Sequence, residues 1–308
     1  MRDITLKPST LRSARATGFV SLPPDTVALV RARGVTKGDV AEAARLSGLM
    51  AIKRTPDLLP HCHPLAVLDA DLDVNTEDGG IRIEARVRTI ASTGVEMEAL
   101  TAVSVAALTV YDMLKPHAPP EALAIGEIRL LEKRGGKTQY RRQLQGMRAA
   151  VIVLSDSVAS GRKPDTAGAS VRDALADAGF EIAGYEVLAD DADALRDCLQ
   201  GYLDAGTECV ITVGGTGLGP RDLTVDTVAP MLTTPLPGFM EAARNFGQQR
   251  TPFAMLSRGV AGMIGSSFVA TFPGSRRGAE ETLAAVLPGL VHLLEVSRSL
   301  RPHEGGYA

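Results

Sequence analysis

The chain has 308 residues, too many for one ordinary hydrophobic core, so two domains are expected. Its formal net charge is −3 and it contains no Trp, which argues against a nucleic-acid partner. Three cysteines, Cys62, Cys198 and Cys209, form no CxxC pair, which fits a reducing compartment and argues against structural zinc. The N-terminal segment lacks the apolar stretch of a secretory signal, and no uninterrupted apolar run reaches ~18 residues. We therefore expect a cytoplasmic protein with no membrane partner.

The first half shows the mixed patterns of an α+β domain. The segment KGDVAEAARLSGLMAIKR, residues 37–54, is an amphipathic helix that should end before Pro56. The segments LAVLDADLDV and IRIEARVRT alternate in polarity, and NTEDGG between them is typical of a hairpin turn. We interpret the charges on their polar faces as structural, because cross-strand pairing sets aspartates near arginines. The apolar face should contain Leu68, Ala70, Leu72 and Val74 of the first strand and Ile81, Ile83, Ala85 and Val87 of the second.

The segment TGVEMEALTAVSVAALTVYDMLK combines an apolar middle with charged ends. The middle predicts a buried helix, and buried carboxylates cost several kcal/mol unless they are paired. Thr93 and Glu96 predict a capping box at the helix start. Asp112 and Lys115, three residues apart, predict an ion pair worth only ~0.2–0.5 kcal/mol. Glu98 has no such local explanation, so the charges together indicate a functional site.

A rigid loop upstream, TPDLLPHCHPL, places His61, Cys62 and His63 between prolines. A turn with a buried histidine and a metal site are both open, although this spacing matches no standard closed zinc site. An acid–base role would require carboxylates and ammonium groups near a histidine. Candidate ammonium groups are Lys37 and Lys53 at the two ends of the neighbouring helix, and Lys133 and Lys137 in EKRGGK.

The second half begins after a basic, glycine-bearing stretch, KRGGKTQYRRQLQGMRAA, which places the domain boundary near Gly146 and predicts domains 1–146 and 147–308. Strands are expected at AAVIVLS, AGYEVLA, CVITVGG and SSFVATFPG. Helices are expected at TAGASVRDALADAG, DADALRDCLQGYLDAG, near GFMEAARNFG and at RGAEETLAAVLPGLVHLLEVSRS. This alternation predicts a mostly parallel α/β sheet, with ligands bound beyond the carboxyl ends of its strands.

A glycine-rich turn, GGTGLGPRDLTVD, directly follows the third of these strands. Such a turn lets backbone N–H groups approach an anion, although glycines after a strand often make only a turn. It matches neither a Walker motif nor the dinucleotide fingerprint GxGxxG. Aspartates at several strand ends beside it suggest Mg²⁺ with a nucleotide. These residues are Gly214, Gly215, Gly217 and Gly219, followed by Asp222 and Asp226, with Asp156 and Asp190 after the earlier strands. Helix N-caps remain an alternative for Asp190 and for Ser275 of FPGSRRG.

The first half resembles the MoaC family of cyclic pyranopterin monophosphate synthases through KGDVAEAARLSGLMAIKRTPDLLPHCHPL, TGVEMEALTAVSVAALTVYDMLK and RLLEKRGGK. The resemblance implies a ferredoxin-like α+β fold, a hexamer with sites at dimer interfaces, and lyase chemistry without a redox cofactor. The implied reaction rearranges a cyclised GTP derivative, a pterin precursor, with release of pyrophosphate. It implies that Asp112, Lys115, Lys53 and His63 are catalytic. The implied substrate-binding residues are Arg12, Lys37, His61, Cys62, His63, Glu96, Met97, Glu98, Lys133 and Lys137.

The second half resembles the MoaB/MogA family through LSDS, DTAG, GGTGLGPRDLTVD, LPGFMEAAR, LSRGVAGM and FPGS. The resemblance implies a three-layer α/β/α fold, trimers or hexamers, and molybdopterin binding. Active members are adenylyltransferases that transfer AMP from Mg-ATP to molybdopterin. By motif, Asp190 and Asp222 are the catalytic aspartates and the expected Mg²⁺ ligands. The phosphate loop would be Gly214, Gly215, Thr216 and Gly217, and Ser275 would lie on the pterin side.

The two resemblances together describe a multifunctional enzyme of molybdenum cofactor biosynthesis, assembled as a hexamer or a trimer of dimers. The two reactions are not consecutive, so direct transfer of an intermediate is not implied. In the alternative, the second half is a non-catalytic pterin-binding or oligomerisation scaffold. A dinucleotide oxidoreductase is disfavoured because the chain lacks GxGxxG with its downstream acidic residue.

Overall fold

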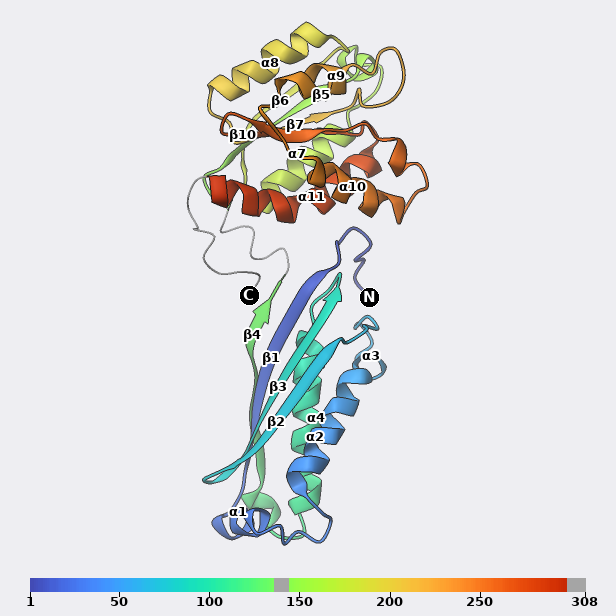
Figure 1. Cartoon of the computed structure of the whole chain (residues 1–308). Helices are drawn as coiled ribbons and strands as arrows, with labels where there is room; N and C mark the ends of the chain where they lie inside the picture. Colours follow the sequence, from blue (N-terminus) through green and yellow to red (C-terminus); the bar gives the residue numbers. More distant parts are fainter. Residues whose placement is uncertain (136–143, 298–308) are drawn as a thin grey trace. The chain divides into compact units, whose positions relative to one another are not determined.

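A computed structural model of the protein describes residues 1–135 and 144–297 (Figure 1). The chain forms two compact units, Met1–Gly136 and Lys137–Ala308. The division lies ten residues before Gly146, near which the sequence predicts the domain boundary. The first unit contains β1 (Thr10–Ser21), α1 (Pro24–Arg31), α2 (Val40–Lys53), α3 (Thr55–Leu58), β2 (Asp69–Glu77), β3 (Gly80–Ala91), α4 (Glu96–Leu114), the 3₁₀ turn η1 (Pro120–Ala122) and β4 (Ala124–Arg134).

The first unit has two layers, a four-stranded antiparallel sheet and a pair of helices. The strands are ordered β2-β3-β1-β4, and α2 and α4 pack on one face of this sheet (Figure 1). The expected helix ends at Lys53, and Pro56 lies in the short helix α3 that follows. The element order β-α-β-β-α-β with this strand order is the split β-α-β arrangement. The predicted α+β class is therefore observed.

The hairpin of β2 and β3 follows the predicted alternation. Ile81, Ile83, Ala85 and Val87 are buried against the helices, and the turn closes at Gly79 with φ +83°. The prediction for Leu68 is wrong, because this side chain is 63% exposed. Leu68 precedes the first residue of β2 and so lies outside the regular part of the sheet.

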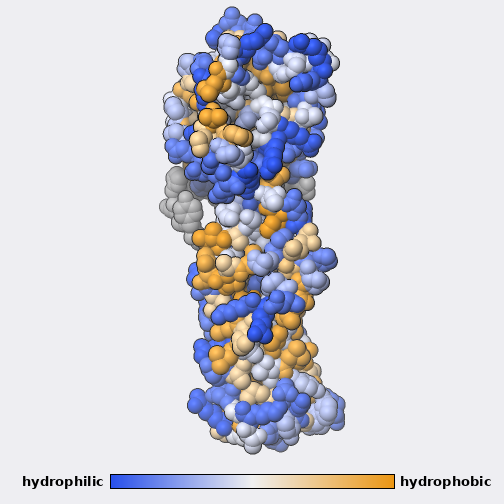
Figure 2. Space-filling view, turned by 90° about the vertical axis from the view of Figure 1, so that its right-hand side faces the viewer, coloured by the Kyte–Doolittle hydropathy of each residue, from blue (hydrophilic) through white to orange (hydrophobic). Residues whose placement is uncertain are grey.

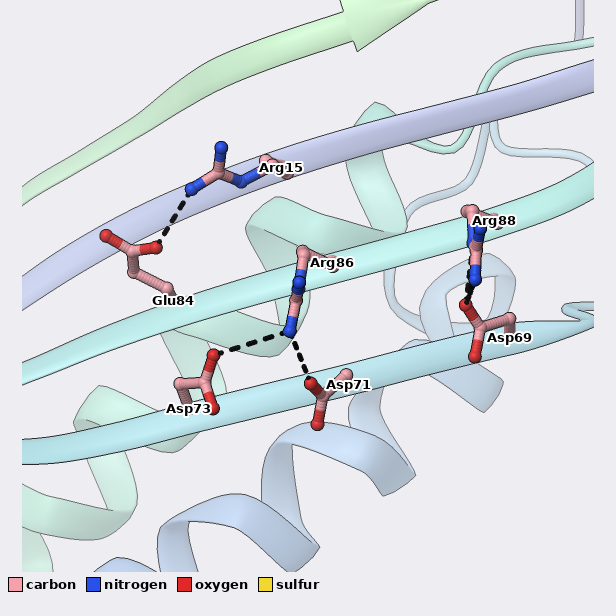
Figure 3. Close-up of polar contacts among 7 residues, drawn as sticks. All are labelled: Arg15, Asp69, Asp71, Asp73, Glu84, Arg86 and Arg88. Carbon is pink, nitrogen blue, oxygen red and sulfur yellow. Dashed lines mark hydrogen bonds and ion pairs between the residues drawn. The ribbon is translucent and has the colours of Figure 1, made fainter. Parts of the chain in front are cut away.

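The outer face of this sheet has the predicted cross-strand ion pairs (Figure 3). Arg88 lies 2.6 Å from Asp69, Arg86 lies 2.8 Å from Asp71 and 3.7 Å from Asp73, and Arg15 lies 3.2 Å from Glu84. These side chains are largely exposed, so each pair contributes at most about 1 kcal/mol. Their structural interpretation is consistent with this geometry.

The helix α4 is the core helix of the first unit. It packs against β1, β3 and α2, and most of its apolar residues are buried. Within the part of the chain that the structure describes, α4 is the one helix whose length and apolar composition would allow it to cross a membrane, although its ends are charged. Core helices of globular units share this length and composition, and half of the most apolar stretch of α4 is buried.

The second unit begins with a strand and alternates strands with helices. Its elements are β5 (Arg148–Leu154), α6 (Asp156–Ala159), α7 (Ala167–Ala178), β6 (Glu181–Leu188), α8 (Ala192–Asp204), β7 (Cys209–Val213), α9 (Thr224–Val228), η3 (Ala229–Met231), β8 (Thr234–Pro235), α10 (Pro237–Gln248), η4 (Ala254–Leu256), β9 (Ala261–Ile264), β10 (Ser267–Phe272) and α11 (Arg276–Ser297). All four predicted strands and all four predicted helices are present.

The sheet of this unit is mixed and lies between two helical layers. Its order is β6-β5-β7-β10-β9-β8. The first four strands are parallel, β9 pairs antiparallel with β10, and β8 pairs antiparallel with β9. One core packs α7, α10 and α11 on one face, and a second core packs α8 and α9 on the other (Figure 1). The chain passes from β5 to β6 on one side and then to β7 on the other. This reversal places a topological switch point beyond the carboxyl ends of β5 and β7.

Candidate active sites

Asp112 lies between two lysines at the C-terminal end of α4. Its carboxylate oxygens are each 2.8 Å from an ammonium nitrogen, Oδ1 from Lys115 Nζ and Oδ2 from Lys37 Nζ. These contacts, that of Lys115 first, lower the pKa of Asp112 to about 2, and the same contact raises the pKa of Lys115. At neutral pH Asp112 is therefore ionised and Lys115 is protonated. The predicted ion pair is present, but Asp112 and Lys115 are 58% and 57% exposed, so the expectation of buried charge is wrong here.

The N-terminal end of α4 holds two glutamates in different environments. Glu98 is only 3% exposed, and burial, followed by the charge of Glu96, raises its pKa. Burial also acts to raise the pKa of Glu96, but the hydrogen bond from Lys133 and the charges of Lys133 and Arg12 lower it. The predicted capping box is wrong, because Glu96 is the first helical residue and no side chain caps the helix start. Its carboxylate pairs instead with Lys133 of β4.

Several other predicted residues gather around this N-terminal end. Burial and then the charge of Glu98 raise the pKa of Cys62, which keeps it a neutral thiol. Arg12 is 8% exposed on β1 and donates from Nε to the carbonyl of Ala91 at 3.3 Å.

The helix α2 runs antiparallel to α4, because Lys37, which precedes α2, contacts Asp112 at the C-terminal end of α4. Lys53, the last residue of α2, therefore lies toward the N-terminal end of α4. Met97 is 41% exposed on the first turn of α4, His61 is exposed, and His63 is half-buried. Lys137 lies outside the described residues.

The predicted residues of the first unit therefore form two clusters. Asp112 and Glu96 are sixteen residues apart on one helix, which corresponds to about 24 Å at 1.5 Å per residue. The structure brings Lys37, Asp112 and Lys115 together, and it brings Arg12, Glu96 and Lys133 together, but it separates these two groups within the chain.

An acidic cavity of about 280 Å³ lies at the switch point of the second unit. Asp165, Asp190 and Asp222 line it. Asp156 lies next to Asp190, and the carboxylate of each accepts a hydrogen bond from the backbone N–H of the other, at 3.1 and 3.3 Å respectively. Burial raises the pKa of Asp190, and the charges of Asp156 and Asp222 raise it further. Arg221 forms an ion pair with Asp156 and offsets this negative charge. The N-cap of α8 is Asp191, so the capping alternative for Asp190 is wrong and Asp190 lines the cavity instead.

The glycine-rich turn forms one wall of this cavity. Gly214 has φ +103° and Gly215 has φ +60°, and a Cβ at either position would clash, with the Leu154 carbonyl or the Thr224 hydroxyl respectively. Asp222 folds back onto this turn and accepts a hydrogen bond from the N–H of Gly219 at 2.8 Å. The turn thus fixes the carboxylate of Asp222 at the cavity wall.

Arg258 tethers the same turn from outside the cavity. Its Nε donates to the carbonyl of Gly217 at 3.0 Å, and its Nη2 donates to the carbonyl of Asp222 at 3.1 Å. Its partner carboxylate is Asp226, at 3.0 Å, so Asp226 does not join the other aspartates at the strand ends. Sequence reasoning assigned no role to Arg221 or Arg258, although both lie within the quoted family motifs.

A second cavity, of about 440 Å³, borders the same turn at Thr216 and Gly217. Its walls are largely apolar and include Met240, Phe253 and Pro273. Ser275 lines this cavity, and its Oγ also accepts a hydrogen bond from the N–H of Gly278 at 3.3 Å, as the capping alternative predicted. The remaining polar lining residues are Arg244, Thr251, Ser257, Glu281 and Thr282.

The residues present suit Mg²⁺ bound together with phosphate groups. In the part of the chain that the structure describes, no three His, Cys, Asp or Glu side chains converge as a ready-made metal cage. Mg²⁺ commonly takes only one or two protein carboxylates and completes its coordination with phosphate oxygens and water. Asp190 and Asp222, both at the wall of the acidic cavity, supply such a pair.

Comparison with known proteins gives each unit a separate match. Residues 1–136 match the MoaC family, and residues 150–292 match the family described as "Probable molybdopterin binding domain". The first region is 53% identical to a cyclic pyranopterin monophosphate synthase of Thermomicrobium roseum, over 46% of this chain and 87% of that protein. The second half also aligns with the structure of MoaB from Thermus thermophilus at 38% identity, covering 51% of this chain and 98% of that chain, with a TM-score of 0.48.

One relative spans both units in the same order. A molybdenum cofactor biosynthesis bifunctional protein of Chlorobaculum tepidum is 42% identical over 95% of this chain and 92% of its own length. The first unit is thus a cyclic pyranopterin monophosphate synthase domain, and the second is a molybdopterin-binding domain. The chain belongs to the family of bifunctional molybdenum cofactor biosynthesis proteins, in which a MoaC domain is fused to a MoaB/MogA-like domain.

Proposed function

We propose that the first unit acts as an oligomer in which one copy supplies the cluster of Asp112. Its partner would supply the cluster at the N-terminal end of α4, which contains Glu96 and Lys133 and lies beside Glu98. The observation that carries this proposal is the separation of about 24 Å between the two clusters along α4. Both clusters border solvent in one copy, because Asp112 and Lys133 are 58% and 44% exposed. Bringing the two together from different copies would complete one site and remove both from bulk water.

The chemistry of these clusters supports the rearrangement of a cyclised GTP derivative with release of pyrophosphate. A triphosphate requires several cations, which Arg12, Lys37, Lys53 and Lys133 would provide. Lys115 is protonated and would donate a proton, while Asp112 stays ionised and orients it. Glu98 has a raised pKa, which suits a group that accepts and returns protons. The histidine loop, residues 61–63, would contact the same substrate.

The surface of the first unit supports association with other copies. Leu46 and Met50 on α2 and Leu108 on α4 are each more than half exposed. The edge strand β4 adds three further exposed apolar residues, Ile128, Leu130 and Leu131. Figure 2 shows apolar surface spread over this unit. Exposed apolar patches and an unpaired strand edge are typical of interfaces, and we propose a hexamer or a trimer of dimers. The split β-α-β arrangement also supports a ferredoxin-like fold for this unit.

For the second unit we propose transfer of AMP from Mg-ATP to molybdopterin, with release of pyrophosphate. The acidic cavity would hold the phosphates, with Asp190 and Asp222 as ligands of Mg²⁺, which neutralises phosphate charge. The N–H groups of the Gly214–Gly217 turn would face the phosphate oxygens. The neighbouring apolar cavity would hold the pterin, so that the shared turn lies between the two substrates. The non-catalytic scaffold is the competing proposal.

The test is an assay of the intact chain with the substrate of each unit in turn. Formation of cyclic pyranopterin monophosphate tests the first unit, and Mg-ATP-dependent formation of adenylylated molybdopterin tests the second. Asp222→Ala should weaken use of Mg-ATP more than it weakens pterin binding, and Asp173→Ala, an exposed change on α7, should alter neither. Pterin binding without any AMP transfer would favour the scaffold, and equal loss of both in Asp222→Ala would refute the assigned role.

The three cysteines all lie within the described residues and none is paired in a disulfide. This supports our proposal of a cytoplasmic, reducing environment. The modest net charge of −3 supports small-molecule partners rather than nucleic acid. We propose that the protein acts on small molecules without a nucleic-acid or membrane partner.

A further inference from the structure

One carboxylate is buried in the wall of the apolar cavity of the second unit. The side chain of Glu281, on the second turn of α11, is only 5% exposed. Its Oε1 accepts a hydrogen bond from Nε of Arg277, one helical turn earlier, at 2.8 Å. The side chain of Arg277 is 75% exposed, so this partner approaches from the solvent side. The carboxylate therefore lies between a solvated arginine and a cavity of about 440 Å³.

A buried carboxylate of this kind is costly unless hydrogen-bond donors satisfy its oxygens. Among the described residues, the contact with Arg277 engages a single oxygen through a single nitrogen. A carboxylate has two oxygens and can accept about four hydrogen bonds. Acceptor capacity thus remains at a cavity whose other walls, such as Met240 and Phe253, are apolar.

We propose that Glu281 recognises the 2-amino-4-oxo edge of the pterin, which deepens the proposed function because it rests on the pterin occupying this cavity. That edge carries two adjacent donors, the 2-amino group and N3–H, which match the two oxygens of one carboxylate. The neighbouring 4-oxo group is an acceptor. Arg244 lines the same cavity, and its guanidinium donates to the carbonyls of Ser257 and Gly259 at 3.4 and 3.5 Å. The apolar walls accommodate the flat ring system.

The same geometry disfavours adenine in this cavity. The corresponding edge of adenine places one donor, the 6-amino group, beside an acceptor, N1. A carboxylate facing that edge would gain one hydrogen bond and meet one lone pair. Glu281 therefore separates the two substrates of the proposed reaction, directing the pterin to the apolar cavity and leaving the nucleotide to the acidic one.

The test measures ring binding without any reaction, so it is independent of AMP transfer. Binding of 6-hydroxymethylpterin and of 6-hydroxymethyllumazine to the intact chain is followed by ligand fluorescence. The two probes share N3–H and the 4-oxo group, and they differ at the 2-position, which is an amino donor in the pterin and an oxo acceptor, with a proton on the neighbouring N1, in the lumazine. We expect the wild-type chain to prefer the pterin by at least tenfold, since hydrogen bonds to charged groups contribute about 1.5–3 kcal/mol. Glu281→Gln should lose that preference through weaker pterin binding.

Two further variants separate recognition from folding. Glu280→Gln changes the adjacent glutamate, which pairs with Ser170 and Arg276, and should keep the pterin preference. Arg277→Ala removes the partner of Glu281 but keeps its carboxylate, so the preference should persist. Loss of the preference in Arg277→Ala to the same extent as in Glu281→Gln would overturn the proposal and leave Glu281 a structural residue. Three other outcomes would also overturn it. The wild type could bind both probes equally, or it could show no saturable pterin binding up to the solubility limit. Alternatively, Glu281→Gln could lose ATP binding alone.

Preserved pterin selectivity without AMP transfer would refute the adenylyltransferase activity and support the role of Glu281. Conversely, AMP transfer to molybdopterin that persists in Glu281→Gln, with unchanged probe selectivity, would support the activity and refute the role. The two failures are therefore distinguishable.

Discussion

Asp112 is held in its charged form by the two lysines on either side of it. A lowered carboxyl pKa means that the folded chain binds fewer protons than the unfolded chain, so the stabilisation is present above about pH 4. It is lost as the pH falls from the ordinary value of 3.8 through about 2. In the proposed reaction, a proton donated by this cluster would therefore come from Lys115 rather than from Asp112.

Asp112→Asn should abolish formation of cyclic pyranopterin monophosphate while the fold survives, because Asp112 is 58% exposed. Thermal unfolding should show the variant slightly less stable than the wild type at pH 7, and the two should converge as the pH falls toward 2. Glu121→Gln, an exposed change in η1, serves as the control. Near-normal turnover in Asp112→Asn would refute its assigned role.

Glu98 shows the opposite shift, because burial favours its neutral form. A raised carboxyl pKa means that the folded chain binds more protons, so the wild type loses stability as the pH rises above the ordinary value of 4.5. Glu98→Gln removes this loss, and should be at least as stable as the wild type at pH 8, with the difference vanishing near pH 4. Its turnover in the first reaction should fall by about tenfold or more. A variant less stable at pH 8 than at pH 4, relative to wild type, would contradict the assignment.

At the scale of elements, the glycine turn after β7 has no room for a side chain. Gly214 combines φ +103° with a clash of any Cβ against the Leu154 carbonyl. We expect Gly214→Ala to destabilise the second unit by about 3 kcal/mol, the sum of backbone strain and overpacking. Gly265→Ala is the matched control, since its φ is +59° but no atom lies within 4 Å of the added Cβ. That change should cost about 1 kcal/mol, measured by denaturant unfolding. Similar costs at both positions would show that the close approach to Leu154 is unimportant.

The sequence predicts elements well where the pattern is long and local. The alternation of β3 and the apolar middle of α4 are both realised, because burial on one face determines them. The strands β8 and β9 were not predicted, since two and four residues carry no readable period. The longer strands β1 and β4 and the helix α1 were not predicted either. The capping box failed because Lys133, distant in the chain, competes for Glu96. Likewise the tether of Arg258 and the pairing of Arg221 depend on contacts between distant loops, which no local pattern encodes.

At the scale of the whole molecule, the first reaction requires more than one chain if the two clusters form one site. Mixing two variants, each impaired in a different cluster, tests this directly. Asp112→Asn and Glu98→Gln, unfolded or dissociated together and reassembled at equal amounts, should regain about a quarter of wild-type activity. The reason is that random pairing gives about one site in four with both clusters intact. Each variant reassembled alone should keep its own low activity. A mixture that forms mixed oligomers but gains no activity over the separate variants would contradict the shared site.

The length of α4 restricts how this chain can tolerate insertions. One residue inserted in the middle of this nineteen-residue helix would rotate the following part of the helix by about 100°. That rotation would turn Asp112 away from Lys37 and leave Glu98 in place. The hairpin turn at Asp78 and Gly79 can lengthen without disturbing either cluster. Related chains that differ in size should therefore vary at that turn and keep this helix constant, because in the proposed oligomer it would be a fixed spacer between the two halves of a shared pocket.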